Sequence, residues 1–212
     1  MNVNFIISNH DQDAYIPHLV KIIEGFKVIK PNGIICHSGQ TDPDFHYLRC
    51  ENHPKEPFPR MHSFNHWNKV KQGYEKIKGM GNTRYISLCS DSWLCDENAI
   101  IKIFNRMEQL KCGYGGNWWN NEFAENPMVS SDIFFADTRF GNIFEAVEPD
   151  EREFETWLHR GCVRKGIGIY IVHKREPVHP DHRHVCEKLR WTMSHNMEEN
   201  IANARKWGSL PL

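Results

Sequence analysis

Two tryptophans stand beside several asparagines in a segment with the chemistry of a sugar-binding surface. Asn117, Trp118 and Trp119 are followed by two further asparagines, in a glycine-rich stretch that starts at Gly113. An exposed indole ring offers an apolar platform for the C–H face of a sugar, and an asparagine amide matches hydroxyl groups as donor and acceptor. These three residues are therefore predicted to bind a sugar. The alternative is two core tryptophans in a long loop.

A second group of chemically capable side chains lies nearer the C-terminus. His179, His182 and His184 fall within six residues of a segment that also contains two prolines. Imidazole suits Mn²⁺ or Zn²⁺ better than Mg²⁺ or Ca²⁺. His179 and His182 alone are too few for a structural zinc site, which usually has four ligands. The histidines are thus either metal ligands or incidental members of a surface loop.

The elements that must position these residues alternate between strands and helices. Apolar and β-branched runs predict strands at 3–8, 33–36, 84–89, 133–136 and 168–173. Helical spacing predicts helices at 15–26, 67–78, 96–110, 150–160 and 185–207, the third capped by Asp96. Segments 40–59, 111–126 and 177–184 are expected to be loops. Strand, helix and strand within the first forty residues form a βαβ unit, so the fold class is α/β with a mostly parallel sheet.

Polar residues follow several of the predicted strands. Such residues occupy 8–13, 36–44, 89–92 and 136–139. A doubly wound sheet binds its ligand outside the carboxyl ends of its strands. We therefore expect the site at these strand ends.

Three segments in the first half of the chain carry a family resemblance. The strand, polar turn and helix start over 5–19 resemble the opening of GT-A glycosyltransferases. Residues 34–44 resemble the Val-Asp-Asp-Gly-Ser-Thr-Asp segment of that family, and 71–94 resemble the helix and strand that lead into its Asp-x-Asp metal motif. The resemblance implies one Rossmann-like GT-A domain over 1–212, with a central mixed sheet flanked by helices. Its nucleotide-binding half would be 1–110, and 111–212 would be the acceptor half with a C-terminal helix.

The resemblance implies a nucleotide-sugar donor held with a divalent metal, Mn²⁺ first and Mg²⁺ as the alternative. Asp91 would be the metal ligand, completed by His182 or His184. The residues implied to bind the donor are Ser8, Asn9, His10, Asp11, His37, Ser38, Asp42, Lys71, Ser90, Asp91 and Ser92. Two departures stand out, because Ser90-Asp91-Ser92 keeps one carboxylate of the motif and His37-Ser38 replaces the Asp-Asp pair. Uridine as the base follows only from the habit of the family.

The resemblance also implies an acceptor side in the second half. Asn117, Trp118 and Trp119 follow the metal strand, where the family places acceptor contacts, so a glycan or glycoprotein acceptor is expected. Glu153 and Glu155 resemble the acidic helix start that carries the base of inverting members, and Asp132 is a candidate near the donor sugar. One base would deprotonate the acceptor hydroxyl. The alternative is a solvated acidic first turn favoured by the helix dipole.

Composition bounds the remaining possibilities. The chain has 212 residues, 40% hydrophobic content and a formal net charge of -1, which suits one domain and disfavours nucleic acid as a partner. No run approaches the ~20 apolar residues of a membrane span. An odd count of seven cysteines without a Cys-x-x-Cys pair predicts reduced thiols and a cytoplasmic location.

Two other functions remain open at this point. A glycosyltransferase-like domain that has lost catalysis would explain the missing motif carboxylates. A His-rich metal hydrolase of another fold would explain the histidine loop, although no second cluster such as His-x-x-x-His is present.

Overall fold

The computed structural model describes residues 1–9, 13–37, 47–48, 61–119, 128–148, 154–175 and 183–211. Its centre is a seven-stranded sheet in the order β3-β2-β1-β4-β7-β6-β8. The strands are β1 Asn4–Ser8, β2 Ile34–His37, β3 Tyr47–Leu48, β4 Arg84–Cys89, β6 Cys112–Trp119, β7 Met128–Asp137 and β8 Gly168–Arg175. β7 is antiparallel to both of its neighbours, whereas the other pairs are parallel. The prediction of an α/β fold with a mixed, mostly parallel sheet is confirmed.

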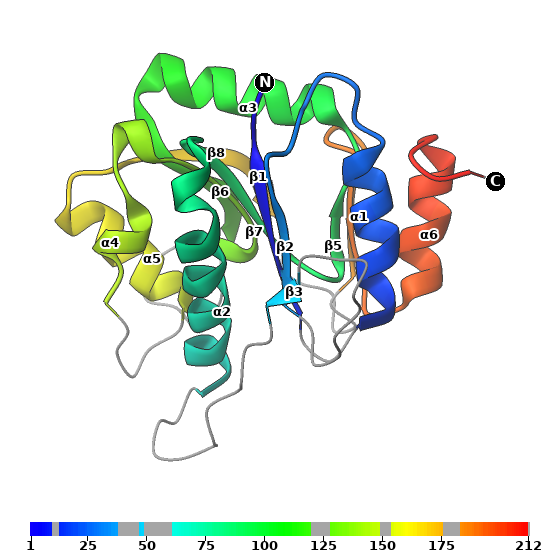
Figure 1. Ribbon diagram of the computed structural model, residues 1–212, viewed down its shortest axis with the longest axis horizontal. Helices are drawn as coiled ribbons and strands as arrows, with labels where there is room; N and C mark the ends of the chain where they lie inside the picture. The colour runs from blue at the N-terminus through cyan, green and yellow to red at the C-terminus, as the bar shows by residue number, and fades with distance from the viewer. Residues whose placement is uncertain are drawn as a thin grey trace.

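Helices cover both faces of this sheet (Figure 1). The helices are α1 Ile16–Glu24, α2 Met61–Ile77, α3 Glu97–Leu110, α4 Ile143–Ala146, α5 Phe154–Arg164 and α6 Met197–Lys206. One hydrophobic cluster joins the sheet to α1, α3 and α6, and a second joins the other face to α2, α4 and α5. Among the described helices, none is long and apolar enough to cross a membrane.

A second, smaller sheet lies beside the first. It has the order β5-β10-β9 and consists of β5 Ser92–Leu94, β9 His184–Cys186 and β10 Trp191–Met193, all antiparallel. Its Trp93 and Trp191 are fully buried and belong to the cluster of α1, α3 and α6. The small sheet therefore fixes the segment after β4 to the C-terminal part of the chain.

The local sequence accounts for most of the elements. β1, β2, β4, β8 and α3 lie within a residue or two of their predicted bounds. Asp96 is the N-cap of α3, and its carboxylate accepts a hydrogen bond of 2.9 Å from the backbone N–H of Asn98.

Two predictions were wrong. The predicted loop over 111–126 contains the long strand β6, because its glycines allow close packing rather than turns. A Cβ on Gly113 would lie 2.8 Å from the Gly141 carbonyl oxygen, and one on Gly115 would lie 2.9 Å from the Met107 sulfur. The predicted helix over 185–207 is instead β9, β10 and the shorter α6, because Trp191 is drawn into the core and β10 pairs with β5.

The predicted halves of the chain are joined through one sheet. β7, β6 and β8 come from the second half and extend the sheet from β4 of the first half. Tyr47–Leu48 forms β3 inside the predicted loop over 40–59, most of which lies outside the described residues. The division into a donor half and an acceptor half stays a prediction.

Candidate functional site

The carboxyl ends of the parallel strands gather one set of predicted residues. β1 ends at Ser8 and β4 at Cys89, and the paired strands place these two residues side by side. Asn9 and Ser90 follow them, and the Ser90 hydroxyl donates to the Asn9 side-chain oxygen at 3.2 Å. Because β7 runs in the opposite direction, its amino end lies at the same edge. The edge predicted from the strand ends is thus formed by β1, β4 and the start of β7. The predicted strand end at 136–139 lies at the opposite edge, because β7 is antiparallel to β4 and Asp137 pairs with Arg84.

Asp91 occupies the turn between β4 and β5. Its side chain is 10% exposed, and its Oδ2 lies 3.2 Å from Nε2 of His195. The neighbouring serines are fully buried and serve the local structure: Ser90 donates its backbone N–H to the Ser8 carbonyl at 2.9 Å, and the Ser92 hydroxyl accepts from the Trp191 indole at 2.8 Å. Of the three residues of the predicted triplet, Asp91 alone keeps some exposure to solvent.

The turn that carries Asp91 is held from the C-terminal side. Asn200 of α6 donates to the Asp91 carbonyl oxygen at 2.8 Å, and the backbone N–H of Ser194 donates to the same oxygen at 3.3 Å. The phenol of Tyr15 donates to the carbonyl oxygen of His195 at 2.6 Å. Burial raises the pKa of Tyr15, and the charge of Asp91 raises it further, so the phenol stays a hydrogen-bond donor.

Two further carboxyl groups lie at the same edge. The Ser131 hydroxyl of β7 donates to Oε1 of Glu155, in the first turn of α5, at 2.5 Å. Burial raises the pKa of Glu155, the Ser131 hydrogen bond opposes that rise, and the charge of Asp132 adds to it. Asp132 and Glu155 are therefore close enough to interact, as two residues that were both predicted to be catalytic.

Three carboxylates affect the pKa of the Cys89 thiol. Burial raises the pKa of Cys89 well above its ordinary value, and the charges of Asp132, Asp91 and Glu155 all act in the same direction. A charge changes the pKa of another group in this way only from nearby. Asp132 precedes Ile133, which pairs with Leu88, and Glu155 is hydrogen-bonded to Ser131 of the same strand β7. The three predicted acidic residues therefore lie near the end of β4, although they come from three separate segments.

Polar residues of α2 contact the residues at the end of β1. Ser8 is fully buried, and its hydroxyl lies 3.0 Å from Nε2 of His66 on α2. The same imidazole nitrogen lies 3.8 Å from the Cys89 sulfur. Lys69, one turn further along α2, donates to the Asn9 carbonyl oxygen at 2.6 Å. The structure thus brings Lys69 to the edge, whereas the predicted Lys71 is exposed on α2.

The predicted metal histidine His184 lies elsewhere in the small sheet. In its register Met193 stands between His184 and Ser92, so one whole strand separates His184 from the Asp91 turn. The His184 ring packs against Trp191 at 4.5 Å and against His173 at 5.7 Å between centroids. Among the described residues, no group of three or more His, Cys, Asp or Glu side chains is arranged to hold a metal ion. His195, and not His184, is the imidazole that meets Asp91.

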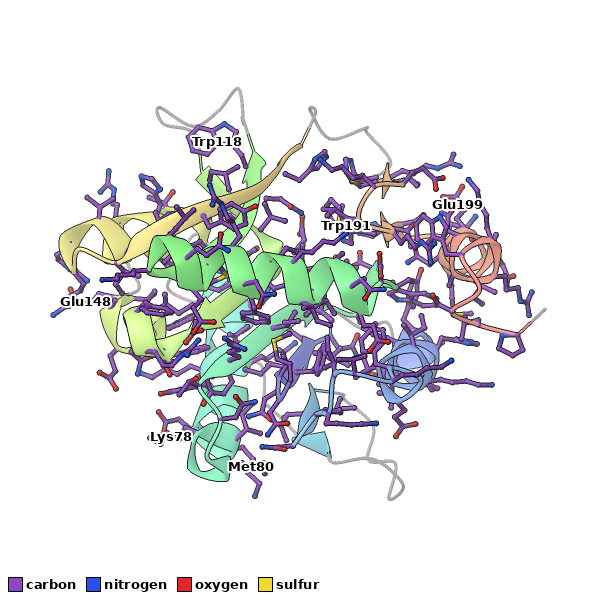
Figure 2. All side chains as sticks on the ribbon, turned by 90° about the horizontal axis from the view of Figure 1, so that it is seen from above. Lys78, Met80, Trp118, Glu148, Trp191 and Glu199 are labelled. Atoms are coloured by element: carbon purple, nitrogen blue, oxygen red, sulfur yellow. The ribbon has the colours of Figure 1, made fainter. Side chains whose placement is uncertain are left out.

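The predicted sugar-binding residues lie at the end of β6. Asn117 is 2% exposed and pairs in register with His173 of β8, while Trp118 is partly exposed. Figure 2 shows Trp118 at the end of its strand, with Trp191 between it and Glu199 of α6 in this view. His37 ends β2 and Trp119 ends β6, but their side chains are not described. The other predicted residues outside the described ranges are His10, Asp11, Ser38, Asp42, Glu153 and His182.

Several solved structures of other proteins have a similar architecture. No protein-family model matches the sequence, and no curated protein matches it. A CMP:2-keto-3-deoxy-manno-octonic acid synthetase complexed with CTP superposes with a TM-score of 0.55 at 8% identity, over 99% of this chain and 100% of the other. A glycosyltransferase involved in the glycosylation of the major capsid of PBCV-1 superposes with a TM-score of 0.50 at 13% identity, over 97% and 100%.

A third similar structure is the bifunctional IspDF from Campylobacter jejuni. It has a TM-score of 0.54 at 8% identity over 83% of this chain, which spans half of the length of that protein. The chain has the fold of these transferases. At such low identity the likeness concerns the fold alone, so the chemistry must be argued from the site.

The residues of this edge that were not among the predicted site residues include Tyr15, His66, Lys69, His195 and Asn200. His195 precedes Asn196, the N-cap of α6, whose side chain accepts from the backbone N–H of Glu198. An Asn with glutamates two and three residues later is a helix-start signal, and it would have separated His195 from the predicted terminal helix. Nothing in the local sequence indicates that this histidine faces Asp91, because β10 brings it there.

Proposed function

We propose that this protein is a glycosyltransferase that moves a sugar from a nucleotide-sugar donor, a UDP-sugar first, to a glycan or glycoprotein acceptor. The observation that carries the proposal is that Asp91, Asp132 and Glu155 lie near the end of β4. Asp91 follows that strand, Asp132 precedes the β7 residue that pairs with Leu88, and Glu155 accepts a hydrogen bond from Ser131. Asp91 has an imidazole partner, whereas Asp132 and Glu155 lie on β7 and α5. Acidic groups in different surroundings suit different tasks, so Asp91 would serve donor binding and Asp132 or Glu155 would remove a proton.

Asp91 and His195 are the residues that would hold a divalent cation. Their Oδ2 and Nε2 atoms already face each other, and a carboxylate with an imidazole suits Mn²⁺. When bound, such an ion neutralises the charge that develops on the departing nucleoside diphosphate. Lys69 lies at the same edge and adds a positive charge beside Asn9.

Glu155 or Asp132 would act on the acceptor. The carboxylate takes the proton of the acceptor hydroxyl, whose oxygen forms a bond to the anomeric carbon as the bond from that carbon to the phosphate oxygen breaks. The raised pKa makes the Glu155 carboxylate the stronger base once it is ionised. This role belongs to an inverting reaction. Asn117 and Trp118, at the end of β6, are the proposed contacts to the acceptor sugar.

The residues after β1 favour glycosyl transfer over nucleotidyl transfer. Phosphate chains are often cradled by the backbone of a glycine-rich turn before a helix. Residues 9–15 contain no glycine. A donor whose diphosphate is neutralised by a metal ion and by Lys69 fits this edge better than a triphosphate bound by the backbone.

A second candidate is a glycosyltransferase-like domain that binds a nucleotide-sugar without transferring it. The single carboxylate in Ser90-Asp91-Ser92 favours it, together with the absence of a three-ligand metal group among the described residues. Donor hydrolysis that depends on Mn²⁺ and is lost in Asp91→Ala would exclude this candidate.

Calorimetry with UDP, GDP and dTDP, each with Mn²⁺ or Mg²⁺, tests the proposal. We expect metal-dependent binding of at least one diphosphate, with UDP the tightest. An absence of binding for all three would overturn the proposed function. Tightly bound zinc in the purified protein, without nucleotide binding, would instead support a metal hydrolase.

A further inference from the structure

Asn200 is a fully buried polar residue in α6, far along the chain from the strand ends. Its side chain is 0% exposed. The Nδ2 group donates to the Asp91 carbonyl oxygen at 2.8 Å and to the Ser194 carbonyl oxygen at 3.3 Å, and Oδ1 accepts from the Thr192 hydroxyl at 2.9 Å. Both hydrogens of the amide and its oxygen therefore have partners.

These partners belong to the two backbone segments that carry Asp91 and His195. The Asp91 carbonyl is in the turn after β4, and the Ser194 carbonyl immediately precedes His195 in the segment between β10 and α6. One amide group thus ties the two carbonyls together. The distance between the Asp91 carboxylate and the His195 imidazole depends on how these two backbones are held.

The chemistry of the position favours asparagine over other residues. Two carbonyl oxygens require a group with two donors, and the Thr192 hydroxyl requires an acceptor at the same site. An aspartate has the same shape but offers only acceptors when ionised, so both carbonyls would lose the amide donor and face a negative charge, and the Asp91 carbonyl would keep the Ser194 N–H. Thr192 is itself held in place, because the Asn203 amide donates to its oxygen at 3.0 Å.

We infer that Asn200 is a positioning residue that sets the relative placement of Asp91 and His195, so that α6 completes the proposed metal-nucleotide site. The inference rests on the proposed function for its consequence on binding, but the positioning itself is a structural claim. Asn200 does not touch substrate and acts through the backbone of its two neighbours. On this inference the C-terminal helix contributes to binding.

Asn200→Asp in the full chain tests this inference against a matched control. Asn105→Asp makes the same chemical change at an exposed position of α3, outside the hydrogen bonds of Asn200 and Thr192. Binding of UDP with Mn²⁺ is measured by calorimetry, and thermal unfolding is recorded for both variants. We expect Asn200→Asp to weaken binding roughly tenfold or more, and Asn105→Asp to stay within about twofold of the unaltered protein.

Crystal structures of the same variants separate this inference from the proposed function. In Asn200→Asp the Asp91 Oδ2 to His195 Nε2 distance should exceed its present 3.2 Å, and in Asn105→Asp it should not change. If the unaltered protein binds neither UDP nor Mn²⁺, the proposed function fails while this structural outcome still decides the role of Asn200. A folded Asn200→Asp that keeps the 3.2 Å contact, or that binds UDP and Mn²⁺ normally, overturns the inference.

A milder variant covers the case in which Asn200→Asp does not fold. Thr192→Val keeps the shape of the side chain and removes the hydroxyl that donates to Asn200 Oδ1. The amide would then be less firmly oriented, and binding of UDP with Mn²⁺ should weaken by about threefold. Unchanged binding in Thr192→Val, with unchanged Asp91 and His195 positions in its crystal structure, would equally contradict the inference.

Discussion

The Asp91 carboxylate lies 3.2 Å from the His195 imidazole, although the two residues come from opposite halves of the chain. The small sheet explains this proximity, because β10 pairs with β5 so that Met193 faces Ser92. Asp91 immediately precedes Ser92, and His195 follows Met193 by two residues, so both lie just beyond the paired residues. Among the described residues, the imidazole partner of Asp91 is therefore supplied by the segment after β10, and not by His184 of β9.

Replacing His195 should affect nucleotide binding more than replacing His184. We expect Asp91→Ala to abolish metal-dependent binding of UDP and His195→Ala to weaken it by about tenfold or more, as for the loss of one metal ligand or its orienting partner. His184→Ala should have a small effect, because that ring packs on Trp191. Calorimetry with UDP and Mn²⁺ measures all three variants.

Asp96→Ala is the control for these substitutions. It removes the N-cap of α3, close to the site in sequence, and should lower the free energy of unfolding by ~1 kcal/mol without changing binding. Normal binding of UDP and Mn²⁺ by Asp91→Ala would show that the central assignment is wrong even though the fold is right. If His182→Ala and His184→Ala weaken binding while His195→Ala does not, the histidine-rich segment supplies the ligand after all.

Glu155 predicts the direction of a pH dependence. Burial raises its pKa, with a contribution from Asp132, and a base must be ionised to act. Transfer should therefore increase with pH through the raised pKa of Glu155, and Glu155→Gln should lose about a hundredfold in kcat. Ser131→Ala removes the hydroxyl that donates to the carboxylate and should move the acid limb to higher pH. The exposed Glu24→Gln, at the end of α1, serves as the control.

The same raised pKa makes a prediction about stability. The folded protein favours the protonated Glu155 more than the unfolded chain does, so its contribution is fully present below the unfolded pKa and is lost as pH rises through the folded pKa. Glu155→Gln should therefore gain stability relative to the unaltered protein at pH 8 and lose this advantage at acid pH. Urea unfolding at several pH values measures the difference, and a pH-independent difference would contradict it.

A substitution at Gly113 tests the close packing around strand β6. A Cβ there would lie 2.8 Å from the Gly141 carbonyl oxygen and 2.9 Å from the Phe140 carbonyl oxygen. Since both are backbone atoms, Gly113→Ala should lower the free energy of unfolding by ~1–3 kcal/mol. Gly79→Ala has nothing within 4 Å of its added Cβ and should be nearly neutral. Equal stability of the two variants in urea unfolding would refute this packing.

Asp137 ends β7, at the edge of the sheet opposite to the candidate site. Its buried carboxylate accepts hydrogen bonds from Arg139 Nη2 at 2.6 Å and from Arg84 Nε at 3.3 Å, and the hydrogen bond from Arg139 is the main reason that the arginine pKa is raised. Asp137→Asn should destabilise the fold by ~1–3 kcal/mol. Binding of UDP and Mn²⁺ should not change in the folded variant, because the site lies at the other end of the strand. Lost binding with unchanged stability would return Asp137 to the site.

The sequence by itself determined the first half of the fold. β-branched runs bounded by polar turns predicted β1 and β4, and Asp96 before Glu97 predicted the start of α3, because these patterns depend on local propensity and capping. Where strands run parallel, their carboxyl ends share one edge, so the order of strands and helices along the chain was enough to place the polar residues after β1 and β4 together. Asp91, Ser8 and Asn9 belong to this part.

Only the tertiary structure decided which side chains meet there. Pairing with β7 and β8 makes β6 a strand, and Met107, Gly141 and Ile167 pack closely against its glycines. Pairing of β10 with β5 brings His195 to Asp91 and buries Asn200 against both backbones. Such contacts join segments that are distant in the sequence, and each depends on burial and pairing energies that no local pattern contains.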